Sequence, residues 1–134
     1  MYVPSGCDSG WKEFENACYK FYTSSITTWF SARDACLNEN SLLASIHSDD
    51  EQNFIRTIIT STSYNVWIGG KMGTFDYEWE DGSEFGFTYW QPSEPNYDGE
   101  CIMMSQSYSY QWYDTACKQS YNSYKYVCKR TYTK

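Results

Sequence analysis

The stretch EPNYDGEC, residues 94–101, concentrates side chains that could hold a cation. Its carboxylate and amide side chains are those of Glu94, Asn96, Asp98 and Glu100. Calcium, a hard cation, takes about six to eight oxygen ligands, and three carboxylates suit a divalent ion better than a neutral substrate. Pro95 restricts the backbone between its two neighbours. The loop alone leaves a second interpretation open, namely an acidic surface that only faces water.

The composition of the chain favours cations over anions as partners. The formal net charge of the 134 residues is −7, which makes phosphate backbones and anionic membranes poor partners. Aromatic residues make up 20% of the chain and supply ample bulk for a core. The length suits one core, so we expect a single domain over residues 1–134. No apolar run approaches the length of a membrane span.

Six cysteines predict three disulfides. They are even in number and none has CxxC spacing, which argues against zinc or iron–sulfur ligation. Spacing alone does not choose among the possible pairings. Disulfides are typical of proteins outside the reducing cytosol, so we expect a secreted protein. No leader pattern is visible at the N-terminus, so a secreted form is expected to have lost its signal peptide.

The N-terminal part of the chain predicts a hairpin followed by a helix. Residues 7–24 predict the hairpin, because the chain passes a turn-rich stretch and returns into an aromatic run. Residues 27–40 predict the helix, because Trp29, Ala32 and Cys36 fall on one stripe at helical spacing.

Residues 48–60 predict a second helix. Ser48 and Glu51 have the S-x-x-E spacing of a capping box at its start. The expected apolar face consists of Phe54, Ile55, Ile58 and Ile59.

The rest of the chain predicts short strands. The candidates are residues 66–70, 77–82, 101–105, 110–114 and 125–130. Two early helices followed by mostly antiparallel strands predict an α+β domain. The segment between residues 70 and 101 contains little regular structure, and long irregular segments in compact domains are usually functional.

Five features in this order resemble the C-type lectin-like domain, in its long form with an N-terminal hairpin. They are the six cysteines, the helix pair, WIGG at residues 67–70, Glu94-Pro95-Asn96 ahead of Cys101, and W-x-D at residues 112–114 followed by Cys117. The resemblance extends from about residue 7 to residue 130. It implies the C-type lectin fold, with two helices, antiparallel sheets and a long irregular loop region that binds calcium and sugar. It also implies the disulfides Cys7–Cys18, Cys36–Cys128 and Cys101–Cys117.

The resemblance further implies a site for calcium and sugar. Its expected residues, which would contact both the ion and the sugar, are Glu94, Asn96, Glu100 and Asp114. In this family the Glu94–Pro95 peptide bond would be cis. The EPN order goes with mannose, fucose, N-acetylglucosamine or glucose. A Glu carboxylate accepts hydrogen bonds, whereas an Asn amide also donates, so the two together can bind vicinal hydroxyls.

The chain departs from the family pattern at two ligand positions. Tyr113 replaces the usual Asn, and a phenol is a poor calcium ligand. Gly99 replaces the usual Glu, which leaves Glu100 next to Cys101, with Asp98 as the alternative loop ligand. We therefore expect weaker calcium binding that depends on sugar. The acids of a second calcium site are lacking, because Lys71, Met72 and Tyr97 occupy those places, so one ion is expected.

No arrangement of residues predicts an enzyme. His47 is the only histidine, and no HExxH, P-loop or GxGxxG motif occurs. Glu94 and Glu100 share one short loop, which does not suit a glycosidase pair. The predicted function is calcium-dependent binding of glycans with mannose-type terminal sugars. The alternative is a calcium-independent module that binds a protein. Nucleic acid is not an expected partner, and no heptad or collagen-like segment encodes an oligomer.

Overall fold

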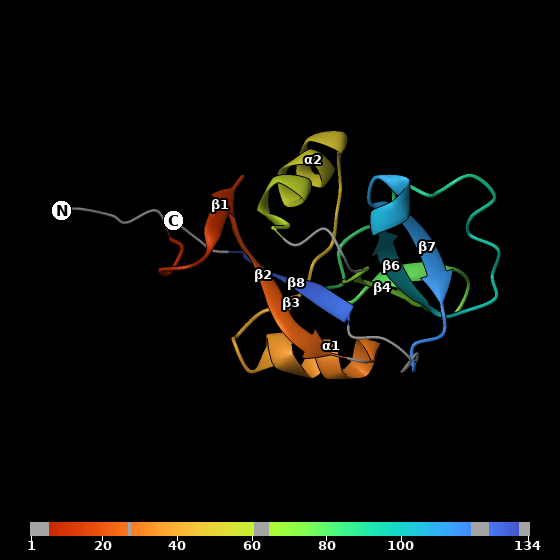
Figure 1. Ribbon diagram of the computed structural model, residues 1–134, viewed down its shortest axis with the longest axis horizontal. Coiled ribbons are helices and arrows are strands. Elements are labelled where there is room, and N and C mark those ends of the chain that lie inside the picture. Colours follow the sequence, from red (N-terminus) through yellow and green to blue (C-terminus); the bar gives the residue numbers. More distant parts are fainter. Residues whose placement is uncertain (1–5, 27, 61–64, 119–123, 132–134) are drawn as a thin grey trace.

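The structure, a computed structural model, describes residues 6–26, 28–60, 65–118 and 124–131 (Figure 1). The expected domain limits, Met1 and Lys134, lie outside these ranges. In chain order the elements are β1 (Lys12–Phe14), β2 (Ala17–Ile26), α1 (Trp29–Leu37), β3 (Leu42–Leu43), α2 (Asp49–Ile58), β4 (Val66–Met72), β5 (Tyr77–Trp79), β6 (Cys101–Ser105), the 3₁₀ turn η1 (Gln106–Tyr108), β7 (Gln111–Thr115) and β8 (Tyr124–Thr131). The N-terminal hairpin, both helices and all five strand candidates are confirmed.

The strands of the described residues form one sheet in the order β1-β2-β8-β4-β6-β7, with β3 paired to β8 and β5 to β4. Every pairing is antiparallel except that of β4 with β8, which is parallel. The α+β class and the mostly antiparallel pairing are thus confirmed, and the one parallel pairing makes the sheet mixed. Hydrophobic pattern reports burial of a strand but not which distant strand lies beside it, so the parallel contact was not predictable.

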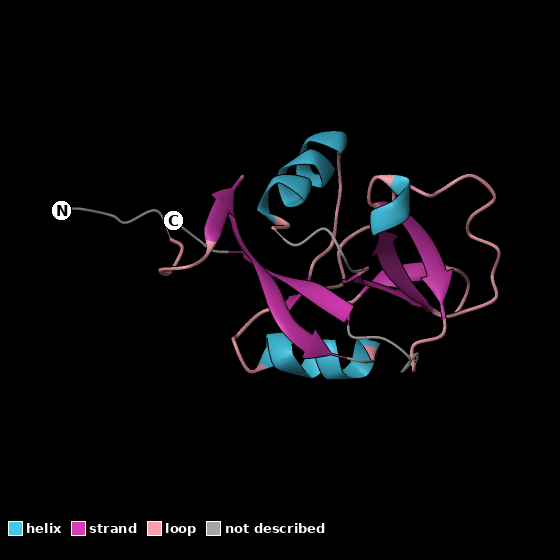
Figure 2. Cartoon of the chain, viewed as in Figure 1, coloured by secondary structure: helices cyan, strands magenta, loops and turns pink. Residues whose placement is uncertain are grey.

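The two helices lie on opposite sides of strands β2 and β8 (Figures 1 and 2). Successive side chains of β4 point to opposite faces of the sheet. Accordingly, Trp67 belongs to the core cluster that contains Trp29 of α1. Val66 and Ile68 belong to the cluster that contains Ile55 of α2. Neither the α-helices nor η1 has the length and apolar character that crossing a bilayer requires, as far as the chain is described.

All three expected disulfides are present, namely Cys7–Cys18, Cys36–Cys128 and Cys101–Cys117. The second joins α1 to β8 across a sequence separation of 92 residues. In the chain-entropy model a closed loop of this length contributes about 4–5 kcal/mol to stability. The third joins Cys101, the first residue of β6, to Cys117, two residues after the end of β7. The loop of residues 94–100 leads into this end of the sheet.

Helix α2 begins with the predicted cap, but its glutamate has a different role from the expected one. Ser48 Oγ accepts a hydrogen bond from Glu51 N at 3.0 Å. The Glu51 carboxylate reaches His47 N at 2.7 Å instead of returning to the cap residue. Its other oxygen accepts from the Tyr19 hydroxyl and from Lys129 Nζ, each at 2.5 Å. The half of the capping box that Glu51 was expected to supply was therefore a wrong prediction, because this carboxylate is buried in an ion pair.

A second buried polar residue of α2, Gln52, ties the helix to β7. Its Oε1 accepts a hydrogen bond from the indole of Trp112 at 2.9 Å, and its Nε2 donates to Tyr110 O at 3.2 Å. Gln52 is fully buried, which the apolar stripe did not predict. The stripe itself is confirmed, with Ile55 and Ile59 buried and Phe54 and Ile58 partly buried.

The long loop between β5 and β6, residues 80–100, covers the outer edge of β7. Tyr89 O accepts from Trp112 N at 2.8 Å, and Gln91 N donates to Trp112 O at 2.9 Å. The rings of Phe85, Phe87 and Trp90 surround the Trp112 indole at centroid distances of 5.7–6.2 Å. The loop lies at the end of the molecule opposite the β1–β2 hairpin (Figure 1). Backbone pairing and aromatic packing thus fix an irregular segment where it approaches the end of β7.

Replacing Gln52 tests how strongly α2 depends on this polar link. Gln52→Met keeps the volume of the side chain but leaves the Trp112 indole N–H buried without its acceptor. We expect a loss of about 1–3 kcal/mol in the free energy of unfolding, measured by urea denaturation. Asn53→Ala, on the exposed side of the same helix, is the control and should change stability by less than about 0.5 kcal/mol. Equal effects of the two substitutions would contradict the assignment.

Candidate functional site

Asp114, near the end of β7, is the centre of the site. It pairs with Ile102 of β6 and is only 3% exposed. Asp114 Oδ1 accepts a hydrogen bond from Asn96 N at 3.1 Å. Its Oδ2 lies 2.7 Å from the Tyr77 hydroxyl, which donates to it. A buried carboxylate needs such partners, because ionising it away from water is otherwise costly. Asp114 therefore holds the long loop against the sheet.

Glu94 approaches the same carboxylate from the loop. The Glu94–Pro95 peptide bond is cis, as expected. Glu94 Oε1 accepts from Asp114 N at 3.3 Å. Burial and the adjoining carboxyl of Asp114 raise the pKa of Glu94 to about 7. Burial opposes ionisation of Asp114, but hydrogen bonds from Glu94, Tyr77 and the Asn96 N–H lower its pKa. The pair therefore keeps one proton, on Glu94, until the pH is near neutral.

Asn96 and Asp98 continue the loop beside this pair. Asn96 Oδ1 accepts a hydrogen bond from Asp98 N at 3.1 Å, which closes a small turn. Both side chains are exposed. The charge of Asp98 adds to the rise in the pKa of Glu94, so its carboxylate acts on the site electrostatically. The structure thus brings Glu94, Asn96 and Asp114 together, with Asp98 near by.

Glu100 occupies a different place. Its backbone oxygen accepts from Met72 N at 2.7 Å, which ties this end of the loop to β4. Its exposed side chain helps to line a surface pocket between α1 and the loop. The pocket is lined by Phe30, Asp98, Gly99, Glu100, Ala116, Cys117 and Lys118. No described contact joins the Glu100 carboxylate to Asp114, so the role of Glu100 as a ligand stays a prediction.

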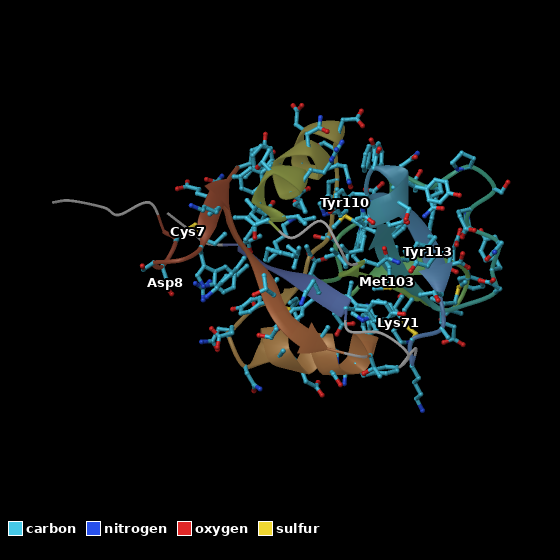
Figure 3. The ribbon with its side chains drawn as sticks, viewed as in Figure 1. Cys7, Asp8, Lys71, Met103, Tyr110 and Tyr113 are labelled. Atoms are coloured by element: carbon cyan, nitrogen blue, oxygen red, sulfur yellow. A yellow bond between two sulfur atoms is a disulfide. The ribbon has the colours of Figure 1, made fainter. Side chains whose placement is uncertain are left out.

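The two departures from the family pattern each have a local physical reason. A Cβ on Gly99 would lie 2.1 Å from the backbone carbon of Thr115, so no side chain fits there unless the chain shifts. The Tyr113 hydroxyl accepts from Asn65 Nδ2 at 2.8 Å and lies 3.3 Å from Met103 Sδ (Figure 3). Because Tyr113 precedes Asp114 on β7, its side chain points to the opposite face of the sheet. Its hydroxyl is occupied by contacts with Asn65 and Met103.

Sequence reasoning missed Tyr77. It lies in the strand candidate YEWEDG, residues 77–82, and is only 3% exposed. Its hydroxyl lies 2.7 Å from both Asp114 Oδ2 and Gly99 O, and its single proton can serve one acceptor at a time. No local signal connects residue 77 with residue 114, because only the sheet order places them side by side.

The donor set can be compared with the needs of calcium. Among the residues that the structure describes, no group of three or more His, Cys, Asp or Glu is arranged to hold a metal. The carboxyl groups of Glu94 and Asp114 lie in contact, whereas the Asn96 amide oxygen accepts from Asp98 N. These groups supply fewer than the about six to eight oxygens that calcium takes. The shared proton of Glu94 and Asp114 marks a place where a cation could replace it. The set fits calcium only if water or ligand oxygens complete the shell.

Comparison with known proteins supports the fold. The family model described as the Lectin C-type domain matches residues 25–130. Ladderlectin of Oncorhynchus mykiss is 33% identical over 125 residues, covering 87% of this chain and 65% of that protein. The chain spans less than two thirds of the length of this relative, and smaller shares of several others.

Two solved structures differ in what their descriptions say of ligands. The cow carbohydrate-recognition domain of CD23, described in the presence of a GlcNAc2Man3 oligosaccharide, is 32% identical with a TM-score of 0.83 and coverage of 96% of this chain and 98% of that one. A calcium-independent type II antifreeze protein is 30% identical with a TM-score of 0.80 and coverage of 93% and 94%. C-type lectin domains are binding modules and not enzymes. With a matching family model, the three disulfides and the fold described above, the chain belongs to the C-type lectin domain family.

Proposed function

We propose that the chain binds carbohydrate at the site formed by Glu94, Asn96 and Asp114, with one calcium ion. The observation that carries this proposal is the loop of Glu94 and Asn96, which the Asn96 N–H holds against the buried carboxylate of Asp114. A carboxylate only accepts hydrogen bonds, and an Asn amide both accepts and donates. Because both lie on one ordered turn, Glu94 can accept a hydrogen bond from one of two vicinal sugar hydroxyls, and Asn96 can donate one to the other.

These residues would share the work as follows. Asp114, fixed from both oxygens, would anchor the ion, and Glu94 and Asn96 would contact both ion and sugar. When bound, calcium would supply positive charge to which vicinal hydroxyl oxygens coordinate. We propose mannose-type specificity from the EPN order, which the family associates with mannose, fucose, N-acetylglucosamine or glucose. Glu100 or Asp98 would add a further oxygen, and we favour Asp98, because its charge already acts on Glu94.

We further propose that residues 1–134 work as one recognition domain, secreted from the cell. Three disulfides are typical of extracellular proteins. The partners would be glycans that end in mannose-type sugars. A single exposed site of this kind should have a dissociation constant on the order of millimolar, so useful avidity would need several copies.

One set of observations favours a second candidate, a calcium-independent module that binds a protein. Gly99 leaves no side chain at a usual ligand position, and the Tyr113 hydroxyl is held by Asn65. Asp114 is already satisfied by protein partners, so the loop can keep its shape without an ion. The similarity to a calcium-independent antifreeze protein also favours this second candidate.

Calorimetric titration of calcium into chelator-treated protein tests the proposal. We expect weak binding that tightens when methyl mannoside is present, because sugar hydroxyls complete the coordination shell. Methyl galactoside is the matched control and should leave calcium affinity unchanged. Sugar binding that persists at full strength in chelator would rule out the calcium site. Absence of heat with either sugar would favour the calcium-independent module.

A pair of substitutions tests which acid completes the site. Asp98→Asn should weaken calcium binding in the presence of methyl mannoside, because it removes a carboxylate that already acts on Glu94. Glu100→Gln is the matched control on the same loop and should have the smaller effect. The reverse order of effects would assign the ligand to Glu100.

The raised pKa of Glu94 predicts how stability varies with pH in the metal-free protein. An unfolded glutamate has a pKa of about 4.3, whereas the folded value is about 7. The proton shared with Asp114 therefore contributes stability that is present below the unfolded pKa and lost as the pH rises through about 7. In chelator, we expect the melting temperature of Glu94→Gln to exceed that of the wild type at pH 8.

The same pair of proteins supplies the control at low pH. At pH 5 the wild-type carboxyl keeps its proton, so the advantage of Glu94→Gln should shrink or vanish. Asp114 titrates in a lower window, because its pKa is lowered, and does not contribute between pH 5 and pH 8. A difference between the two proteins that is independent of pH would contradict the shared proton.

A further inference from the structure

Tyr97, the residue after Asn96, presents a fixed aromatic surface beside the proposed site. Its side chain is 60% exposed. One face of its ring stacks on the ring of Tyr77, with a centroid distance of 5.8 Å and an interplanar angle of 18°. An aromatic ring held on one face and largely exposed resembles a platform more than a freely rotating surface side chain.

The ring below Tyr97 is itself immobilised. Tyr77 is 3% exposed and its hydroxyl contacts Asp114 Oδ2 and Gly99 O. Its ring packs against Trp90 at 5.6 Å. The platform therefore rests on the same side chain that holds the central carboxylate of the site.

The backbone also fixes Tyr97. Its φ of 61° lies in the left-handed region, which non-glycine residues adopt at an energetic cost. Hydrogen bonds on both sides hold this conformation, from Asn96 N to Asp114 Oδ1 and from Asp98 N to Asn96 Oδ1. A tyrosine ordered in this way before a ligand arrives loses little entropy on binding.

We infer that the outer face of Tyr97 is a second contact for the ligand. The Tyr97 ring stacks on the C–H face of the sugar next to the one that Glu94 and Asn96 hold. The inference rests on the proposed function and deepens it, because it selects glycans of at least two sugars over monosaccharides. The negative face of an aromatic ring attracts the weakly positive C–H groups of a sugar ring. The other exposed aromatic residues that the structure describes lack this setting. Phe75 is 97% exposed and has no ring contact with another described residue. Tyr108 lies in η1, which joins β6 to β7 at the end of this strand pair opposite Cys101 and Thr115.

The test compares methyl α-mannoside with an α-linked mannobiose by calorimetry, in the presence of calcium. Tyr97→Asn removes the ring and keeps a residue that accepts a left-handed backbone. We expect this variant to lose about three- to tenfold in affinity for mannobiose and little for the monosaccharide. Tyr97→Phe, which keeps the ring, should bind both ligands as the wild type does. Tyr108→Ala, at an exposed tyrosine outside the site, is the matched control and should change neither affinity.

Other outcomes would overturn the inference in distinguishable ways. If the wild type binds mannobiose no better than methyl α-mannoside, and Tyr97→Asn changes neither affinity, the platform is wrong while the proposed function stands. If Tyr97→Asn weakens both sugars and calcium alike, Tyr97 only shapes the loop. If the wild type binds neither sugar with or without calcium, the platform and the proposed function fail together.

Discussion

The buried carboxylate of Asp114 is the interaction on which the site region depends. An ionised acid that is 3% exposed requires hydrogen bonds to replace water, and here they come from different parts of the chain. The N–H of Asn96 brings in the long loop, and the hydroxyl of Tyr77 brings in β5. The carboxyl of Glu94 completes the arrangement and keeps its proton up to near-neutral pH as a result. One desolvated charge thus holds two other segments, the long loop and β5, against β7.

The same carboxylate makes the loop less dependent on an ion than a pair of unpartnered acids would be. Both of its oxygens have protein partners, so the turn around Asn96 and Tyr97 is defined before any ligand is present. Gly99 also contributes to the shape of the loop, because its lack of a side chain lets the loop pack against the backbone of Thr115. Position 99 is one where the family resemblance implies a ligand, and this packing leaves no room for a side chain there.

Two further sets of contacts hold β7, the strand that carries Asp114, in place. The first is aromatic, because Phe85, Phe87 and Trp90 of the loop surround Trp112 of β7. The second is polar, because the indole of Trp112 donates to the buried amide of Gln52 in α2. A buried amide with both ends satisfied fixes the position of a helix more specifically than apolar contacts do. Trp112 therefore transmits the packing of α2 to the strand that carries Asp114.

The sequence by itself determined the α+β class, the two helices, the strands and, through its resemblance to a known family, the disulfide pairing and the cis bond. Local pattern sufficed for the elements, because helical stripes and strand alternation depend on neighbouring residues. It also singled out Glu94, Asn96 and Asp114, which hydrogen bonds join in the structure. Only the tertiary structure decided that Glu51 and Gln52 are buried and that Tyr77 holds Asp114. These outcomes depend on which distant groups meet in a region without water, and the free energy of burying a polar group is set by those partners rather than by its neighbours in sequence.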